Sequence, residues 1–149
     1  MRVLVSCDYS TAGMHVLREA KKFLAPIADV EIHVTSIIDI AIISASGLYD
    51  NAEIVKVLEA QAEEVNKWAK TTFEGKEVHF STEVGYPAEM IVQKAKKLDA
   101  DLLILGTHGK TGISRILIGS VAENVLRHIS CNTLVVPVTH LKNGQNGSH

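Results

Sequence analysis

The stretch from Asp101 to Val125 constrains the fold more than any other part of the sequence. It begins with Leu-Leu-Ile-Leu at 102–105, a short apolar run typical of a strand buried between helices in a parallel sheet. Glycines follow it, and they let the backbone turn and approach a ligand closely. We expect Ser120 to cap a helix over Val121–Ile129, whose N-terminal amides and dipole favour an anion such as phosphate. The glycines are Gly106, Gly109, Gly112 and Gly119.

Two familiar phosphate loops do not fit this stretch. Gly109-Lys110-Thr111 looks like the end of a Walker A loop, but Ile104 stands where that loop needs its first glycine. The dinucleotide fingerprint fails because Thr107 and His108 separate Gly106 from Gly109. The spacing is instead G-x2-G-x9-G-S, which resembles the nucleotide motif of the universal stress protein family.

The resemblance extends over nearly the whole chain, to about Val138. Further segments match the family's pattern in order, and together they are similar to its ATP-binding subgroup. The matching segments are the first strand ending at Asp8, Ile37-Ile38-Asp39, Gly85-Tyr86-Pro87 before a helix, and SCNTLVVP at 130–137.

Alternating strand-like and helix-like patterns predict one α/β domain over residues 1–138, built on a parallel sheet, with a flexible polar tail at 139–149. Strands are expected at Arg2–Cys7, Val30–Ile37, Glu77–Val84, Asp101–Leu105 and Thr133–Pro137. Helices are expected at Thr11–Leu24, about Asn51–Phe73, Ala88–Leu98 and Val121–Ile129, with Ser10 capping the first and Pro87 opening the third. The resemblance implies an open five-stranded sheet of order 3-2-1-4-5 with helices on both faces, a Rossmann-like adenine-nucleotide-binding fold.

The segment 39–50 is long for a connection and too apolar for an ordinary solvated loop. It can be a loop or an early turn of the second helix that tucks its apolar groups onto the core. It can equally be a lid whose isoleucines cover a base or a partner. The isoleucines are Ile40, Ile42 and Ile43.

The implied strand order places Asp8 beside Gly106 at one crevice, where the order of a parallel sheet reverses. Asp8 can accept hydrogen bonds from ribose hydroxyls or help to hold Mg²⁺, or it can simply cap a turn. The family resemblance implies that Gly106 lies near the ribose and that the backbone of Ile37 meets the adenine edge. It also implies that backbone amides of Gly109, Gly119, Ser120 and Val121 hold the phosphates.

Two cations in the glycine segment, Lys110 and Arg115, can neutralise terminal phosphate charge or can simply be solvated. The formal charge of −2 gives no electrostatic footprint for nucleic acid or an anionic membrane. The seven histidines show no metal-ligand spacing along the sequence, so a protein-bound transition metal is not expected. Cys7 and Cys131 are interpreted as structural thiols.

The opening residues MRVLVSCDYS lead directly into a strand, and no apolar run reaches the length of a membrane helix, which favours a cytoplasmic protein. The last strand, Thr133–Pro137, would be an exposed apolar edge in a monomer. Relatives in the family commonly pair this strand across a two-fold axis, so the resemblance implies a homodimer. Pro137 lacks a donor, so the pairing must be short or must leave Pro137 outside a bonded position.

The sequence thus favours an ATP-binding regulatory module of the stress response, whose bound nucleotide with Mg²⁺ orders the glycine segment and signals to a protein partner. No set of residues supplies the base and charge stabilisation that hydrolysis needs, so no catalytic residue is assigned and at most weak ATP turnover is expected. Two alternatives stay open. One is a dimeric interaction protein that binds no nucleotide, and the other is a slow ATP hydrolase.

Overall fold

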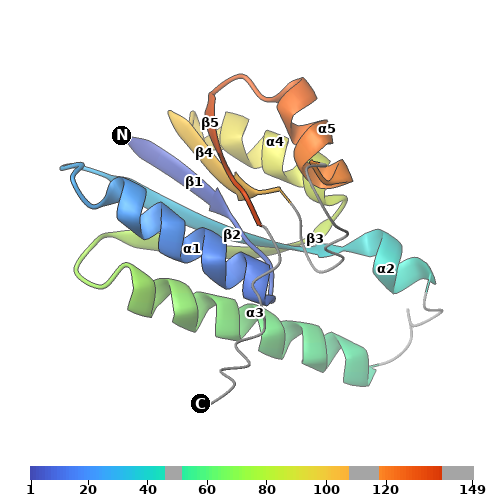
Figure 1. The fold of residues 1–149 in the computed structure, drawn as a ribbon. Coiled ribbons are helices and arrows are strands. Elements are labelled where there is room, and N and C mark those ends of the chain that lie inside the picture. Colours follow the sequence, from blue (N-terminus) through green and yellow to red (C-terminus); the bar gives the residue numbers. More distant parts are fainter. Residues whose placement is uncertain (46–51, 108–117, 139–149) are drawn as a thin grey trace, which may run out of the picture.

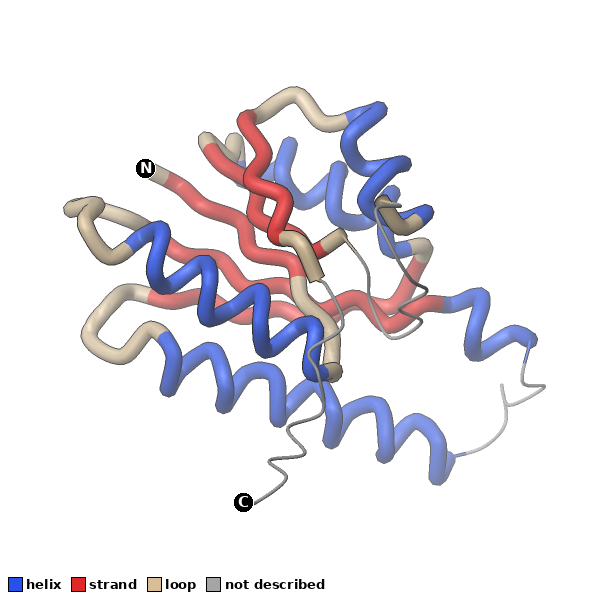
Figure 2. The backbone as a smooth tube through the Cα atoms, viewed as in Figure 1, coloured by secondary structure: helices blue, strands red, loops and turns tan. Residues whose placement is uncertain are grey.

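The computed structural model describes residues 1–45, 52–107 and 118–138, and it has a parallel five-stranded sheet between two layers of helices (Figure 2). The strand order is β3-β2-β1-β4-β5, as the family resemblance implies. The strands are β1 (Arg2–Ser6), β2 (Glu31–Asp39), β3 (Val78–Gly85), β4 (Leu102–Gly106) and β5 (Asn132–Val136). The helices are α1 (Thr11–Leu24), α2 (Ile40–Ala45), α3 (Ala52–Thr72), α4 (Pro87–Leu98) and α5 (Ser120–His128).

Each face of the sheet buries its own core. Helices α1 and α3 cover one face, while α4 and α5 cover the other (Figure 1). Along β1, Val3 and Val5 point into the α1/α3 core and Leu4 points into the α4/α5 core, and all three are fully buried. This explains why the central strands read as unbroken apolar runs. Among the described residues, no helix has both the length and the apolar character needed to span a membrane.

Most predicted element ends lie within two residues of the observed ones. Ser10 caps α1 as expected, since its hydroxyl oxygen accepts the Gly13 amide at 3.0 Å. Pro87 is the first residue of α4. Strand β2 runs two residues further than expected because Ile38 and Asp39 still pair with the end of β3. Strand β5 stops one residue earlier, before Pro137, which has no amide to donate.

The cap expected for α5 was wrong, and the segment after β2, for which several forms were left open, contains a helix of its own. The N-cap of α5 is Gly119, and Ser120 is the first residue inside the helix, so the Ser120 side chain does not cap it. The segment after β2 forms a separate short helix, α2, directly continuous with the strand. Its start is fixed by Asp39, whose Oδ1 accepts the Ala41 amide at 2.8 Å. The end of the 39–50 segment and the tail at 139–149 lie outside the described residues.

The connections that follow β1 and β4 diverge at the carboxyl ends of these neighbouring strands. The chain leaves β1 toward α1 on one face of the sheet and leaves β4 toward α5 on the other face. A crevice opens where neighbouring connections diverge in this way. Strands β3 and β5 are the two outer strands of the sheet.

Candidate functional site

A cavity of about 590 Å³ lies at the carboxyl ends of the strands, where β1 and β4 separate. Residues from the ends of β1, β2 and β4 form its floor, and the starts of α1, α4 and α5 together with α2 and α3 form its walls. Polar groups line the part near β1, β4 and α5, and isoleucine and leucine side chains line the part near α2 and α3. The cavity is therefore suited to a ligand with one apolar and one polar end.

The β1 side of the cavity is a tight turn built around Asp8. The Asp8 carboxylate accepts a hydrogen bond from the Ser10 hydroxyl, and the Asp8 carbonyl accepts the Ser10 amide at 2.9 Å. Asp8 thus fixes the turn before α1 and also lines the cavity. Both interpretations that the sequence left open for Asp8 are compatible with this position, because a capping carboxylate can still offer an oxygen to the cavity.

Gly13 makes this turn possible, although the sequence analysis did not identify it. A Cβ atom at Gly13 would lie 2.1 Å from the Asp8 carbonyl oxygen and 2.9 Å from Oδ1 of the same residue. Such contacts are far inside van der Waals distance, so α1 can approach the turn only with glycine here. The signal in the sequence is a glycine within the first turn of a helix, where glycine is otherwise unfavourable.

The β4 side of the cavity is organised by Thr107. Its carbonyl accepts the Gly119 amide at 2.7 Å, which brings the two described ends of the glycine segment together. Its own amide donates to the Val136 carbonyl at 3.0 Å, and its Oγ1 accepts the Val138 amide at 3.0 Å. Thr107 therefore joins the end of β4, the end of β5 and the start of α5.

The N-terminus of α5 points its first turn at the cavity. Gly119, Ser120, Val121 and Ala122 all line the cavity. The amides of the first helical turn have no acceptor within the helix, and the Gly119 cap offers no side-chain hydrogen bond to them. Together with the helix dipole, these amides form a site that favours an anion.

Apolar side chains close the opposite side of the cavity. Ile37 lies in the floor, Ile42 and Ile43 come from α2, and Ile54 and Leu58 come from α3. The α2 helix is thus part of the cavity wall, which favours the covering role among the alternatives for the 39–50 segment. Ile42 is 65% exposed, so this wall leaves apolar surface open to solvent.

Tyr9 and Cys7 line the cavity and differ in their surroundings. Tyr9 lines the cavity and stacks on Trp68 of α3, with ring centroids 5.1 Å apart and an angle of 15° between the planes. Trp68 is the single tryptophan of the chain. Cys7, in the cavity floor, is buried, and burial raises the pKa of its thiol far above the ordinary value, with the charge of Asp8 adding to the effect. A thiol of this kind stays protonated and unreactive.

Of the residues predicted for the site, the structure brings six together around the one cavity. The three others lie outside the described residues. Those that line the cavity are Asp8, Ile37, Gly106, Gly119, Ser120 and Val121. Those outside the described residues are Gly109, Lys110 and Arg115.

Comparison with known proteins gives a consistent result. A family described as the universal stress protein family matches residues 1–137. Universal stress protein MJ0531 of Methanocaldococcus jannaschii is 35% identical over 128 residues, which cover 84% of this chain and 72% of that protein.

Solved structures extend the comparison to the fold. The structure of hypothetical protein MJ0577 superposes with a TM-score of 0.79 at 30% identity, covering 93% of this chain and 96% of that one. A universal stress protein in complex with cAMP has a TM-score of 0.64 at 24% identity, covering 92% and 96% of the two chains. This second likeness is one of fold.

Proposed function

This chain belongs to the universal stress protein family, and on that premise we propose that it is a regulatory module of the stress response that binds an adenine nucleotide, ATP first, in the cavity at the carboxyl ends of the strands. One observation carries the proposal. Six residues that the family resemblance assigns to the nucleotide site, although far apart in the sequence, line a single cavity. That a universal stress protein of the same fold forms a complex with cAMP is consistent with this choice of ligand.

The two sides of the cavity match the two ends of a nucleotide. The base would lie against the isoleucines of β2 and α2, with the Ile37 backbone at the adenine edge. The phosphates would lie at the start of α5, on the amides of Ser120 and Val121, while the Gly119 amide, which the resemblance also implied for this role, is bound to the Thr107 carbonyl. The ribose would lie between them, near Asp8 in the turn after β1 and Gly106 at the end of β4, both of which line the cavity.

Asp8 is also the residue we propose for Mg²⁺ carried with the nucleotide. A carboxylate oxygen is the ligand that Mg²⁺ prefers, and usually only one or two protein carboxylates bind the ion beside the phosphates. Asp8 lines the cavity and its turn is held by Ser10, so its carboxylate is fixed before the ligand arrives. Lys110 and Arg115 remain candidates for neutralising the terminal phosphates.

The regulatory part of the proposal concerns the glycine segment. Its described ends meet through the bond between the Gly119 amide and the Thr107 carbonyl, next to the proposed phosphate position. A nucleotide bound there would contact the segment and order it, and a protein partner would read the ordered surface. We assign no catalytic residue to this site.

The first test is a titration of freshly purified protein with ATP and Mg²⁺, followed by Trp68 fluorescence and by calorimetry. Because Trp68 stacks on Tyr9 in the cavity wall, binding should change its emission. Any nucleotide released on denaturation is identified by chromatography. Absence of both released nucleotide and binding heat would favour the dimeric interaction protein, and multiple turnover by contaminant-free protein would favour the slow hydrolase.

Variants at Gly119 locate the site. The Gly119 backbone has φ −63° and ψ 159°, which any residue can adopt, so Gly119→Ala and Gly119→Val should fold normally. The added side chain occupies space at the proposed phosphate position. We expect affinity to fall progressively from glycine to alanine to valine, by at least tenfold for valine, with melting temperature almost unchanged. Equal affinities in all three proteins would exclude this position.

A second pair of variants tests Asp8. Asp8→Asn keeps an oxygen for the Ser10 hydroxyl but removes the negative charge, so we expect the Mg²⁺ dependence of ATP binding to weaken. Asp29→Asn is the matched control. Asp29 lies in the turn before β2 with φ 47°, a backbone conformation that asparagine tolerates. Loss of Mg²⁺ dependence in both variants would argue against a specific role for Asp8.

The outer strand β5 supports the proposal that the protein forms a homodimer through Thr133–Pro137. Among the described strands, β5 pairs only with β4, so the other side of β5 can pair with a second copy. Strand β5 ends before Pro137, so the missing donor of that residue does not interrupt the strand. Analytical ultracentrifugation should show a dimer. A monomer at all concentrations would exclude it, and a charged substitution at outer-strand residue Thr133 should weaken the association.

A further inference from the structure

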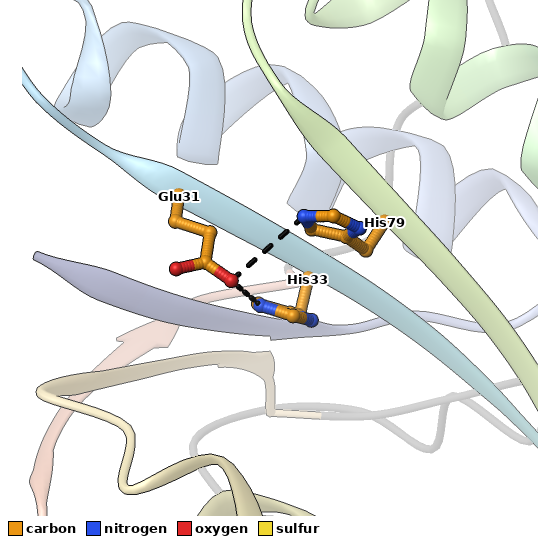
Figure 3. A group of neighbouring side chains, drawn as sticks. All are labelled: Glu31, His33 and His79. Carbon is orange, nitrogen blue, oxygen red and sulfur yellow. Dashed lines mark hydrogen bonds and ion pairs between the residues drawn. The ribbon is translucent and has the colours of Figure 1, made fainter.

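The opposite end of the sheet carries a cluster of ionisable side chains that the proposed nucleotide site does not use. Glu31 and His33 lie at the start of β2, and His79 lies at the start of β3 (Figure 3). One possible ligand atom from each of the three residues lies within 4.8 Å of those from the others. From Glu31 to Asp39, strand β2 spans roughly 26 Å, so this cluster and the cavity lie at opposite ends of the strand.

A short pattern that occurs twice in the sequence creates the cluster. Glu31-Ile32-His33 and Glu77-Val78-His79 both read Glu, apolar, His. Alternation along a strand sends the middle residue to one face and the outer two to the other. Ile32 is buried in the α1/α3 core and Val78 packs against that core, so the glutamates and histidines share the other face.

The register of the sheet then brings the two copies together. His33 pairs directly with His79 across the parallel strands, and their rings stack with centroids 4.7 Å apart and an angle of 21°. On the other side of β2, His33 pairs with Leu4, which belongs to the α4/α5 core. The cluster therefore begins at the edge of that core and extends to solvent. Side-chain exposure rises from 14% at His33 to 41% at Glu31 and 46% at His79.

The Nε2 atoms of His33 and His79 both lie near one carboxylate oxygen of Glu31. Oε1 of Glu31 lies 2.7 Å from Nε2 of His33 and 3.8 Å from Nε2 of His79, as the dashed lines in Figure 3 show. Oε1 of Glu77 lies 3.2 Å from the same His79 nitrogen. In a tetrahedral zinc site with bonds of about 2.0–2.1 Å, neighbouring ligand atoms lie about 3.3 Å apart. The two distances from Glu31 Oε1 bracket that value, and all three ligand atoms lie within 4.8 Å of one another, so the side chains would have to rotate to enclose an ion.

The charges around the cluster are compatible with a cation. Arg2 of β1 lies in register with Glu31 and is the cation to consider beside the cluster. Its guanidinium donates to the Leu98 carbonyl at 2.5 Å and lies 3.6 Å from Asp99, so it has partners of its own.

We infer that Glu31, His33 and His79 form a binding site for a divalent transition-metal ion of the zinc class. Two imidazoles and a carboxylate are a ligand set that zinc binds in proteins, with a further position left for water. The ion would join β2 to the outer strand β3. Metal binding to the folded state would stabilise the protein, because the unfolded chain does not hold these three side chains together. The sequence analysis did not expect a transition metal, since it searched for ligands close together along the chain.

Titration of the untagged full chain with Zn²⁺ tests the site, after removal of metal with a chelator that is then dialysed away. We expect one equivalent to bind and to raise the melting temperature. With Co²⁺ in place of Zn²⁺, we expect the visible absorption bands of a four-coordinate ion. The imidazole resonances of His33 and His79 should be the ones that shift in the nuclear magnetic resonance spectrum. Binding without these shifts, or no binding at micromolar Zn²⁺, would overturn the inference.

Variants separate this site from other histidines of the chain. We expect His79→Gln and Glu31→Gln each to weaken Zn²⁺ binding at least tenfold and to remove the rise in melting temperature. His128→Gln is the matched control, since His128 lies on α5 with its Nδ1 2.8 Å from the Asn124 carbonyl. Unchanged binding in His79→Gln, or an equal loss in His128→Gln, would place the ion elsewhere and overturn the inference. Melting curves of the metal-free variants check that each one folds.

Discussion

The two ends of strand β2 are built in different ways. At the carboxyl end, beside Asp39, the cavity is formed by apolar side chains, backbone amides and a turn that only glycine permits at position 13. At the amino end, beside Glu31, the cluster consists of partly exposed ionisable side chains on the surface of the sheet. The first end depends on shape and the second on side-chain chemistry. Substitutions that crowd the packed turn at the cavity end should therefore cost stability, and those at the amino end should mainly change ligand binding.

The largest effect is expected at Gly13. In Gly13→Ala the new methyl group would lie 2.1 Å from the Asp8 carbonyl oxygen, so the turn or the helix must move. We expect the free energy of unfolding to fall by about 3 kcal/mol. Chemical denaturation measures it.

Gly75→Ala is the matched control for Gly13→Ala. Its φ of +81° makes alanine strained, but among the described residues no atom lies within 4 Å of the added Cβ. The cost there should be only about 1–2 kcal/mol. If Gly13→Ala lowers the free energy of unfolding no more than Gly75→Ala does, the turn at Asp8 adjusts to the added methyl group, and the cavity end does not depend on close packing.

The next largest effect concerns Cys7 in alkaline solution. Its pKa is raised in the folded state, so above the ordinary value of 9.0 the unfolded chain loses the proton and the folded chain keeps it. Stability from this group is complete below pH 9 and declines above it, by up to about 1.4 kcal/mol per pH unit. Between pH 9 and about 10.5, the stability of the wild type relative to Cys7→Ala should fall by about 2 kcal/mol.

Denaturation of both proteins over this pH range checks the prediction for Cys7. Cys131→Ala is the control. The Cys131 pKa is also raised by desolvation, but its side chain is only partly buried, so its effect should be smaller. A constant difference between the wild type and Cys7→Ala across the range would mean that water reaches the cavity floor.

A moderate effect is expected at Thr107. Thr107→Val keeps the backbone bonds to Gly119 and Val136 but removes the oxygen that accepts the Val138 amide. We expect a loss of about 1 kcal/mol, and faster hydrogen exchange at Val138 with the Gly119 amide still protected. Thr133→Val, whose hydroxyl bond to Cys131 is long at 3.4 Å, should cost less. Equal exchange rates at Val138 in wild type and Thr107→Val would contradict this assignment.

The smallest effect is expected at the amino end. In metal-free buffer, His79→Gln should change the free energy of unfolding by no more than about 0.5 kcal/mol, because its side chain is 46% exposed and its ion pairs lie at the surface. A loss of 2 kcal/mol or more would show that the cluster supports the fold, and the contrast between the two ends would disappear.

The sequence predicts the architecture well because the relevant signals are local. The apolar run at 102–105 and the cap at Ser10 depend on residues close to one another in the chain, and both were found as expected. The strand order came from the resemblance and is correct. Six residues named from the resemblance line the cavity, but Gly13 and Thr107, which shape it, were not identified.

Other features depend on contacts between distant residues, which a single sequence does not specify. The role of Thr107 requires β5 to lie beside β4, and the pairing of His33 with His79 requires the register of β2 and β3. The cap of α5 was assigned to Ser120 because serine is a common capping residue, yet the helix begins one residue earlier than expected, at Ser120, and Gly119 is its cap. Local preference is overridden there by the bond that ties Gly119 to Thr107.

That same bond has a consequence for how the chain can vary and be engineered. Because the Gly119 amide and the Thr107 carbonyl meet at 2.7 Å, helix α5 starts at a position set by β4 and not by the number of residues between these two anchors. An insertion or deletion between Thr107 and Gly119 should therefore leave the position of α5 against the sheet unchanged, while it would alter the residues proposed to contact the phosphates.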